Sequence, residues 1–227
     1  RKADQHHLNS EAPLFLTLLT VSSHKWSKAP EDITGFAPTS PDDDEAVYEY
    51  ADRALAGFMA EARTRTWFDS TVFVFVGDHG QAFDPLHEVP IAYHHVPLVI
   101  HAPAVVAPGR LSGYGTQVDL PETILALLRM PHVNNTLGKD LIAGGHAAAC
   151  FMADHRICAI NDRGYLIRDG DVVRLYDHRA RGTRNLSADQ PALRDSLMQQ
   201  AASMVQATHA IVTRKLAGVD GIRPIVP

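Results

Sequence analysis

The chain has 227 residues, which suits one domain with an appendage, because soluble domains usually hold about 100 to 200 residues. Hydrophobic residues make up 45% of the chain and charged residues 21%, so a packed core can form and general disorder is excluded. The net charge of −5 and the isoelectric point of about 6.2 disfavour a nucleic-acid binder, since such proteins usually carry a basic excess.

The first predicted element is a buried strand at residues 13–21, a short apolar stretch bounded by polar residues. The apolar run that contains it is about half as long as the ~20 residues that a membrane-spanning helix needs, so no spanning segment is predicted. A loop rich in Pro, Asp and Ser follows. Acidic residues at 42–45 would complement the positive N-terminus of a helix, and apolar residues at helical spacing predict that helix over residues 45–64.

Residues 71–76 (TVFVFV) give the strongest strand signal, and the segment is apolar on both faces, as in a parallel sheet covered by helices. It ends in the turn Gly-Asp-His-Gly at 77–80. Residues 96–101 predict another central strand. Asp119 as a helix N-cap, with Pro121 in the first turn, predicts a helix over residues 119–129. This order predicts an α/β fold with a mostly parallel central sheet covered by helices.

The pattern of predicted secondary structure changes after residue 146. Short strand-like runs separated by turn residues predict a small antiparallel meander over residues 148–178, and Pro191 opens a long helix that should end near Gly218. We therefore predict an α/β domain at residues 1–146, with a meander and a C-terminal helix packing on it at residues 147–227.

The two cysteines, Cys150 and Cys158, are too few for a disulfide framework. They can be bonded across a hairpin, which would suit an oxidising compartment, or be two buried free thiols. The sequence leaves both interpretations open.

The first candidate site is the pair Asp78 and His79, which follows the predicted strand at 71–76. Ligands of open α/β sheets bind beyond the carboxyl ends of the strands, and the flanking glycines allow a close approach of the backbone. An aspartate oxygen beside a histidine nitrogen suits a divalent ion such as zinc or manganese. A plain turn is the alternative. A catalytic metal takes about three protein ligands, so the others must come from elsewhere in the chain or from missing sequence.

His24, which follows the first predicted strand, reaches the same sheet edge if the two strands are parallel. It is either a donor to an anionic substrate, a general acid or an ordinary loop histidine. Lys25 is a candidate phosphate partner. We expect His87 to be a surface residue rather than a further ligand, and His94 and His95 to position the chain rather than bind metal.

Five stretches together carry a resemblance to a known family. They are residues 50–58 (YADRALAGF), 69–80 (DSTVFVFVGDHG), 89–103 (VPIAYHHVPLVIHAP), 116–128 (TQVDLPETILALL) and 137–141 (LGKDL). In this order and spacing they resemble the alkaline phosphatase and sulfatase superfamily. More narrowly, they are similar to its lipoteichoic acid synthase and phosphoglycerol transferase branch.

The resemblance implies roles for individual residues. Asp78 and His79 match two metal ligands, and His24 matches the histidine that contacts the substrate phosphate, although Lys25 stands where a proline commonly follows. Nothing in residues 1–23 matches the family's threonine nucleophile or its metal-binding glutamate. The resemblance therefore implies that residues 1–146 are the C-terminal half of a catalytic domain whose nucleophile lies upstream, and that the chain alone is inactive.

For the intact protein, the resemblance implies metal-dependent transfer of phosphoglycerol from a phospholipid head group to an alcohol or glycan acceptor. The implied mechanism passes through a covalent phosphoryl-threonine intermediate. Manganese is the expected metal, with zinc or magnesium as alternatives. The expected location is the extracytoplasmic face of the cell membrane, with membrane contact only through upstream helices.

Three other interpretations remain open. A sulfatase or a phosphoethanolamine transferase of the same superfamily would use related chemistry. A non-catalytic module, retained for partner or glycan binding after its site had decayed, is the alternative from a different class.

Overall fold

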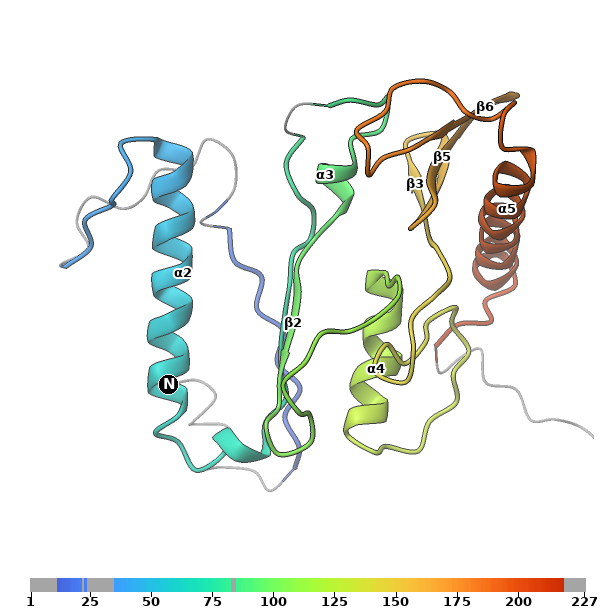
Figure 1. Ribbon diagram of the computed structural model, residues 1–227. Coiled ribbons are helices and arrows are strands. Elements are labelled where there is room, and N and C mark those ends of the chain that lie inside the picture. The colour runs from blue at the N-terminus through green and yellow to red at the C-terminus, as the bar shows by residue number, and fades with distance from the viewer. Residues whose placement is uncertain (1–11, 22, 24–34, 83–84, 219–227) are drawn as a thin grey trace, which may run out of the picture. The chain divides into compact units, whose positions relative to one another are not determined.

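The computed structural model describes residues 12–21, 23, 35–82 and 85–218 (Figure 1). The chain divides into two compact units, Arg1–Thr71 with Ala102–Ala104 and Val72–His101 with Val105–Pro227. The two units do not divide the chain at residue 146. The domain boundary that we predict there stays a prediction.

The main element of the first unit is α2, Asp43–Ala62, which confirms the helix predicted over residues 45–64. Asp42 caps it, because its carboxylate accepts hydrogen bonds from the backbone N–H groups of Asp44 (2.9 Å) and Glu45 (3.1 Å). A short 3₁₀ helix, η1, follows at Phe68–Ser70.

The predicted strand at residues 13–21 is not formed. The described part of this segment is irregular, and its apolar side chains are exposed, with Phe15 82% and Leu19 79% accessible. A strand is stabilised by hydrogen bonds to a neighbouring strand, and no strand among the described residues pairs with this one. The apolar pattern alone could not supply that neighbour.

The second unit begins with a two-stranded sheet of β1, Phe73–Val76, and β2, Leu98–His101. Both strands lie where the sequence predicts them. They pair antiparallel, however, with Phe73 opposite His101 and Val76 opposite Leu98, so the parallel arrangement expected here is wrong for this pair. Among the described residues between them, the chain forms only a four-residue helix, α3, Ile91–His94, whereas a parallel crossover usually carries a longer helix.

The helix predicted over residues 119–129 is α4, Leu120–Leu127, which follows the 3₁₀ helix η2, Gln117–Asp119. Asp119 does not cap α4 with its side chain. Its buried carboxylate instead accepts hydrogen bonds from the backbone N–H groups of Thr116 (2.6 Å) and Lys139 (2.8 Å), and His146 Nε2 lies 2.7 Å away. One carboxylate thus joins three segments of the chain.

The predicted meander is confirmed as a four-stranded antiparallel sheet in the order β3-β4-β5-β6. Its strands are β3, Ala149–Ala153; β4, Arg156–Asn161; β5, Gly164–Asp169; and β6, Val172–Tyr176. The C-terminal helix α5, Pro191–Thr213, starts at the predicted proline and ends before Gly218. It runs beside this sheet (Figure 1), where Leu193 and Leu197 pack against Leu166.

The opposite face of this sheet buries Cys158, Tyr165 and Ile167 together with Val89. Cys150 pairs with Ala159, which is the residue next to Cys158 in β4. Because neighbouring residues of a strand point to opposite faces, the side chains of Cys150 and Cys158 lie on opposite faces of the sheet. Both thiols are therefore free, which decides between the two interpretations that the sequence left open. Burial raises the pKa of the Cys158 thiol to about 11.

The α/β fold class is confirmed, with the antiparallel meander and the terminal helix as predicted. Both sheets of the described residues are antiparallel. Within the same residues, no helix combines the length and apolar character needed to cross a bilayer.

Candidate metal site and the adjoining pocket

Asp78 and His79 lie in the turn that leaves β1, as the sequence predicts. The sheet ladder ends where Gly77 N donates to Pro97 O (3.2 Å). The side chain of Gln117 then holds the turn, because its Nε2 donates to the carbonyl oxygens of Gly77 (2.7 Å) and Asp78 (3.1 Å). This amide, for which the sequence predicted no role, fixes the backbone that carries the pair.

The side chains of Asp78 and His79 lie beside each other on an accessible surface. Asp78 Oδ1 accepts a hydrogen bond from the backbone N–H of His79 (2.9 Å), and Asp78 Oδ2 lies 3.8 Å from His79 Nε2. The two side chains are 71% and 46% exposed, respectively. An oxygen and a nitrogen thus approach a common point that solvent can reach.

The hydrogen bond of His79 Nδ1 assigns the protons of its ring. Nδ1 lies 2.8 Å from Gly80 O, and a carbonyl oxygen can only accept, so Nδ1 carries the hydrogen in neutral imidazole. The lone pair is then on Nε2, the atom nearest to Asp78 Oδ2. Metal-binding histidines commonly use this arrangement, in which the second ring nitrogen donates to a backbone carbonyl.

Gly80 is required by a close approach of the backbone. A Cβ atom at this position would lie 2.0 Å from Ala92 O, and Gly80 N donates to Tyr93 O (2.8 Å). This contact brings the ring of Tyr93 against the imidazole of His79, with centroids 5.0 Å apart. The glycine therefore links the metal-site turn to helix α3.

The chemistry of this donor pair fits a divalent ion. With metal–ligand bonds of about 2.1 Å, two ligands of a tetrahedral centre lie about 3.4 Å apart, close to the 3.8 Å between Asp78 Oδ2 and His79 Nε2. The described part of the chain contains no group of three or more His, Cys, Asp or Glu side chains arranged to hold a metal. The pair thus provides half of a coordination shell.

The other sequence candidates have different positions. His24 and Lys25 lie outside the described residues. His87, expected at the surface, is half-buried: its Nε2 lies 2.9 Å from Gly182 O and its ring packs on Tyr176. His94 packs on Phe151, and burial lowers its pKa.

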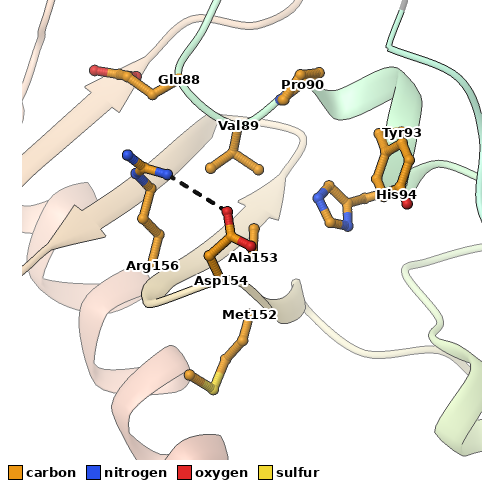
Figure 2. Close-up of a pocket in the computed structure, with 9 residues that line it drawn as sticks. All are labelled: Glu88, Val89, Pro90, Tyr93, His94, Met152, Ala153, Asp154 and Arg156. Atoms are coloured by element: carbon orange, nitrogen blue, oxygen red, sulfur yellow. Dashed lines mark ion pairs between the residues drawn. The ribbon is translucent and has the colours of Figure 1, made fainter.

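A pocket of about 340 Å³ lies between the segment 88–94 and the β3–β4 hairpin (Figure 2). We call it the Tyr93 pocket; it is lined by Glu88, Val89, Pro90, Tyr93, His94, Met152, Ala153, Asp154 and Arg156. Tyr93, which lies against His79, connects it to the candidate metal pair. The sequence did not predict this pocket, because its two walls lie far apart in the chain and only the fold brings them together.

The charged groups of the Tyr93 pocket have partners of opposite charge. Glu88 Oε1 lies 3.0 Å from Arg174 Nε. Arg156 Nε lies 3.0 Å from Asp169, and its Nη1 lies 4.0 Å from Asp154, the contact dashed in Figure 2. The charged side chains of the pocket therefore leave no large uncompensated charge on its walls.

Comparison with known proteins gives one family and several similar structures. The family whose profile matches is described as Sulfatase, and the match covers residues 2–130. Among solved structures, a protein of the alkaline phosphatase superfamily from Vibrio parahaemolyticus has a TM-score of 0.69 at 20% identity, over 86% of this chain and 48% of that chain.

Two phosphonate monoester hydrolases are also similar. The enzyme from Silicibacter pomeroyi has a TM-score of 0.55 at 20% identity, over 79% of this chain and 44% of that one. The enzyme of Agrobacterium radiobacter has a TM-score of 0.53 at 18% identity, over 72% and 41%. This chain thus spans less than half the length of these structures, and the likeness at such identities is one of fold.

Proposed function

Because the chain belongs to the sulfatase family, we propose that it forms part of a metal-dependent phosphoglycerol transferase acting on phospholipid head groups. The family match and the fold confirm the superfamily that the sequence motifs indicate. The narrower assignment to phosphoglycerol transfer to an alcohol or glycan acceptor is our proposal, and it rests on the motifs. The extracytoplasmic face of the membrane is the proposed location.

The observation that carries the proposal is the arrangement of Asp78 and His79. Asp78 Oδ2 and His79 Nε2 lie 3.8 Å apart on an exposed turn that Gln117 holds in place. A bound divalent ion would supply positive charge that stabilises an anionic oxygen developing on phosphorus. The chain's own contribution is to present a carboxylate beside an imidazole whose tautomer leaves Nε2 free to bind the ion.

The proposal assigns the remaining roles as follows. His24 would donate a hydrogen bond to a phosphate oxygen or assist the leaving group, and Lys25 would add a contact to the phosphate. A threonine nucleophile and a metal-binding glutamate would come from sequence upstream of this chain. Manganese is the proposed ion, with zinc or magnesium as alternatives.

A second candidate function is hydrolysis of a sulfate or phosphonate ester. The family description names sulfatases, and two of the similar structures are phosphonate monoester hydrolases. In this case water, rather than an alcohol, would accept the transferred group. Phosphoethanolamine transfer and a non-catalytic binding role are the remaining alternatives.

The test is an assay of the protein in its longest native form, with Mn²⁺ added. Release of diacylglycerol from phosphatidylglycerol would support phosphoglycerol transfer. Turnover of only p-nitrophenyl sulfate or of only a phosphonate monoester would favour the hydrolytic alternative. Turnover of none of the three substrates, nor of phosphatidylethanolamine, would favour the non-catalytic module, whereas turnover of phosphatidylethanolamine alone would favour phosphoethanolamine transfer.

Substitutions connect the activity to the proposed site. We expect Asp78→Asn and His79→Gln each to abolish both metal binding and turnover. Matched controls are Asp171→Asn, an exposed carboxylate, and His209→Gln, an exposed imidazole, which should leave both properties unchanged. Substantial activity in either site variant would contradict the assignment, as would robust activity of residues 1–227 alone.

A further inference from the structure

The Tyr93 pocket is the second feature of the molecule suited to hold a ligand, and Tyr93 is shared between it and the metal-site turn. One face of the phenol ring stacks on His79, and the side chain also lines the pocket. Figure 2 shows Tyr93 and His94 on one side of the pocket, with Asp154 and Arg156 across from them. A group bound there would be a neighbour of whatever His79 binds.

The size of the pocket restricts its ligand. Its volume of about 340 Å³ is near the lower end of the roughly 300–1,000 Å³ typical of small-molecule sites. A glycerol unit or a single sugar ring fits such a space, whereas a long acyl chain does not. Val89, Pro90, Met152 and Ala153 supply apolar walls against which C–H groups can pack.

The charges of the pocket favour a neutral ligand. Glu88 is paired with Arg174 at 3.0 Å, and Arg156 is paired with Asp169 at the same distance, so neither charge needs a counterion from the ligand. An anion such as phosphate would meet two carboxylates, Glu88 and Asp154, and a guanidinium already engaged. Burial also lowers the pKa of His94, which favours its neutral form.

The polar atoms of the pocket are suited to hydroxyl groups. A hydroxyl both donates and accepts hydrogen bonds. The carboxylates of Glu88 and Asp154 can only accept when ionised, and the guanidinium of Arg156 can only donate. Acceptors and a donor around apolar walls are therefore complementary to adjacent hydroxyls on a carbon skeleton.

We propose that the Tyr93 pocket binds a neutral polyhydroxylated group, either a glycerol unit or a sugar ring. We further assign the pocket as the subsite for the alcohol portion of a substrate or acceptor, and this assignment rests on the proposed function. Asp154 Oδ2 and Arg156 Nη1, 4.0 Å apart, form the polar wall that recognises the hydroxyls.

The experiment is an NMR titration of the ¹⁵N-labelled 227-residue chain in metal-free buffer. The probes are glycerol and methyl α-D-glucopyranoside, added separately. We expect saturable shifts of the amide signals of residues 88–94 and 152–156 with at least one probe. Saturation by glycerol alone would identify a small polyol as the ligand class, and saturation by the pyranoside alone would identify a sugar.

Variants test the contacts within the pocket. Asp154→Asn changes an acceptor-only group into an amide, and asparagine tolerates the left-handed backbone found there (φ 54°). Arg156→Lys keeps the charge but loses the planar set of donors. Each should weaken binding about threefold to tenfold, the equivalent of one hydrogen bond, while Asp171→Asn should not change it.

Three results would overturn the inference: no saturable shift with either probe, shifts that both pocket variants leave unchanged, or saturation of the same signals by inorganic phosphate. A parallel titration with Mn²⁺ keeps the two proposals separate, because paramagnetic broadening of residues 77–80 reports on the metal pair. Polyol binding without broadening at 77–80 would support the pocket and contradict the metal site. Broadening without polyol binding would do the reverse.

Discussion

The ring of Tyr93 lies against the imidazole of His79, with the ring centroids 5.0 Å apart and an angle of 20° between the planes. The hydrogen bond from Gly80 N to Tyr93 O (2.8 Å) fixes this stack from the backbone side. The orientation of a candidate metal ligand is therefore set by a residue of α3 that the sequence motifs do not single out.

Removing the Tyr93 ring should weaken metal binding. We expect Tyr93→Ala to reduce the affinity for Mn²⁺ about threefold to tenfold, because the His79 ring loses its packing partner and gains rotational freedom. Tyr93→Phe keeps the ring and should bind as the unchanged chain does. Electron paramagnetic resonance of free Mn²⁺ measures both affinities, and equal binding by Tyr93→Ala would show that the stack has no orienting role.

Gln117→Glu should loosen the metal-site turn. The substitution keeps the shape of the side chain but replaces the Nε2 donor with a carboxylate that faces the carbonyl oxygens of Gly77 and Asp78. We expect a loss of about 1–3 kcal/mol in the free energy of unfolding, together with weaker Mn²⁺ binding. Gln206→Glu, on the exposed surface of α5, is the matched control for urea denaturation. A variant as stable as the control would contradict the predicted role.

Asp119 should be the most sensitive carboxylate of the second unit. It is fully buried, and Asp119→Asn replaces one acceptor oxygen with an amide NH2 group, which would face either the N–H of Thr116 at Oδ2 or the N–H groups of Lys139 and His146 at Oδ1. We expect a loss of about 2–4 kcal/mol in the free energy of unfolding, measured by urea denaturation. Asp171→Asn should change the same quantity by less than about 0.5 kcal/mol.

Stability should fall as the pH is lowered from 7 to 5.5, partly because of His178. Burial, with a smaller effect from Arg179, lowers the pKa of this imidazole from its usual 6.5. The unfolded chain therefore binds the proton more readily than the folded one, so stability is present above pH 6.5 and is lost as the pH falls toward the folded-state pKa. Urea denaturation at several pH values gives the free energy of unfolding as a function of pH, and its slope between pH 7 and 5.5 should be shallower for His178→Gln than for the unchanged chain. An unchanged slope would exclude this contribution.

The core between α5 and the four-stranded sheet should depend on Leu197. This side chain is fully buried among Ala159, Leu166 and Leu175. We expect Leu197→Ala to lose about 2–5 kcal/mol in the free energy of unfolding, through lost apolar burial and the cavity left behind. Val212→Ala, near the exposed end of α5, should cost far less because Val212 is 68% accessible. Similar losses in the two variants would place the core elsewhere.

Local sequence signals located several elements of the fold and the candidate metal pair, Asp78 and His79. Helical spacing behind Asp42 predicted α2, and Pro191 marked the start of α5. The glycine-bounded turn after 71–76 placed Asp78 and His79 at a strand end, where the structure has them. These features depend on residues close together in the chain, through caps, periodicity and turn residues, so the sequence by itself determines them.

Only the tertiary structure decided the features that depend on distant residues. The direction of β2 against β1, the exposure of residues 13–21 and the walls of the Tyr93 pocket all follow from which segments meet. The two cysteines show the reason most simply. A strand alternates faces at every residue, so the register that pairs Cys150 with Ala159 sends Cys158 to the other face, and that register became visible only in the paired strands.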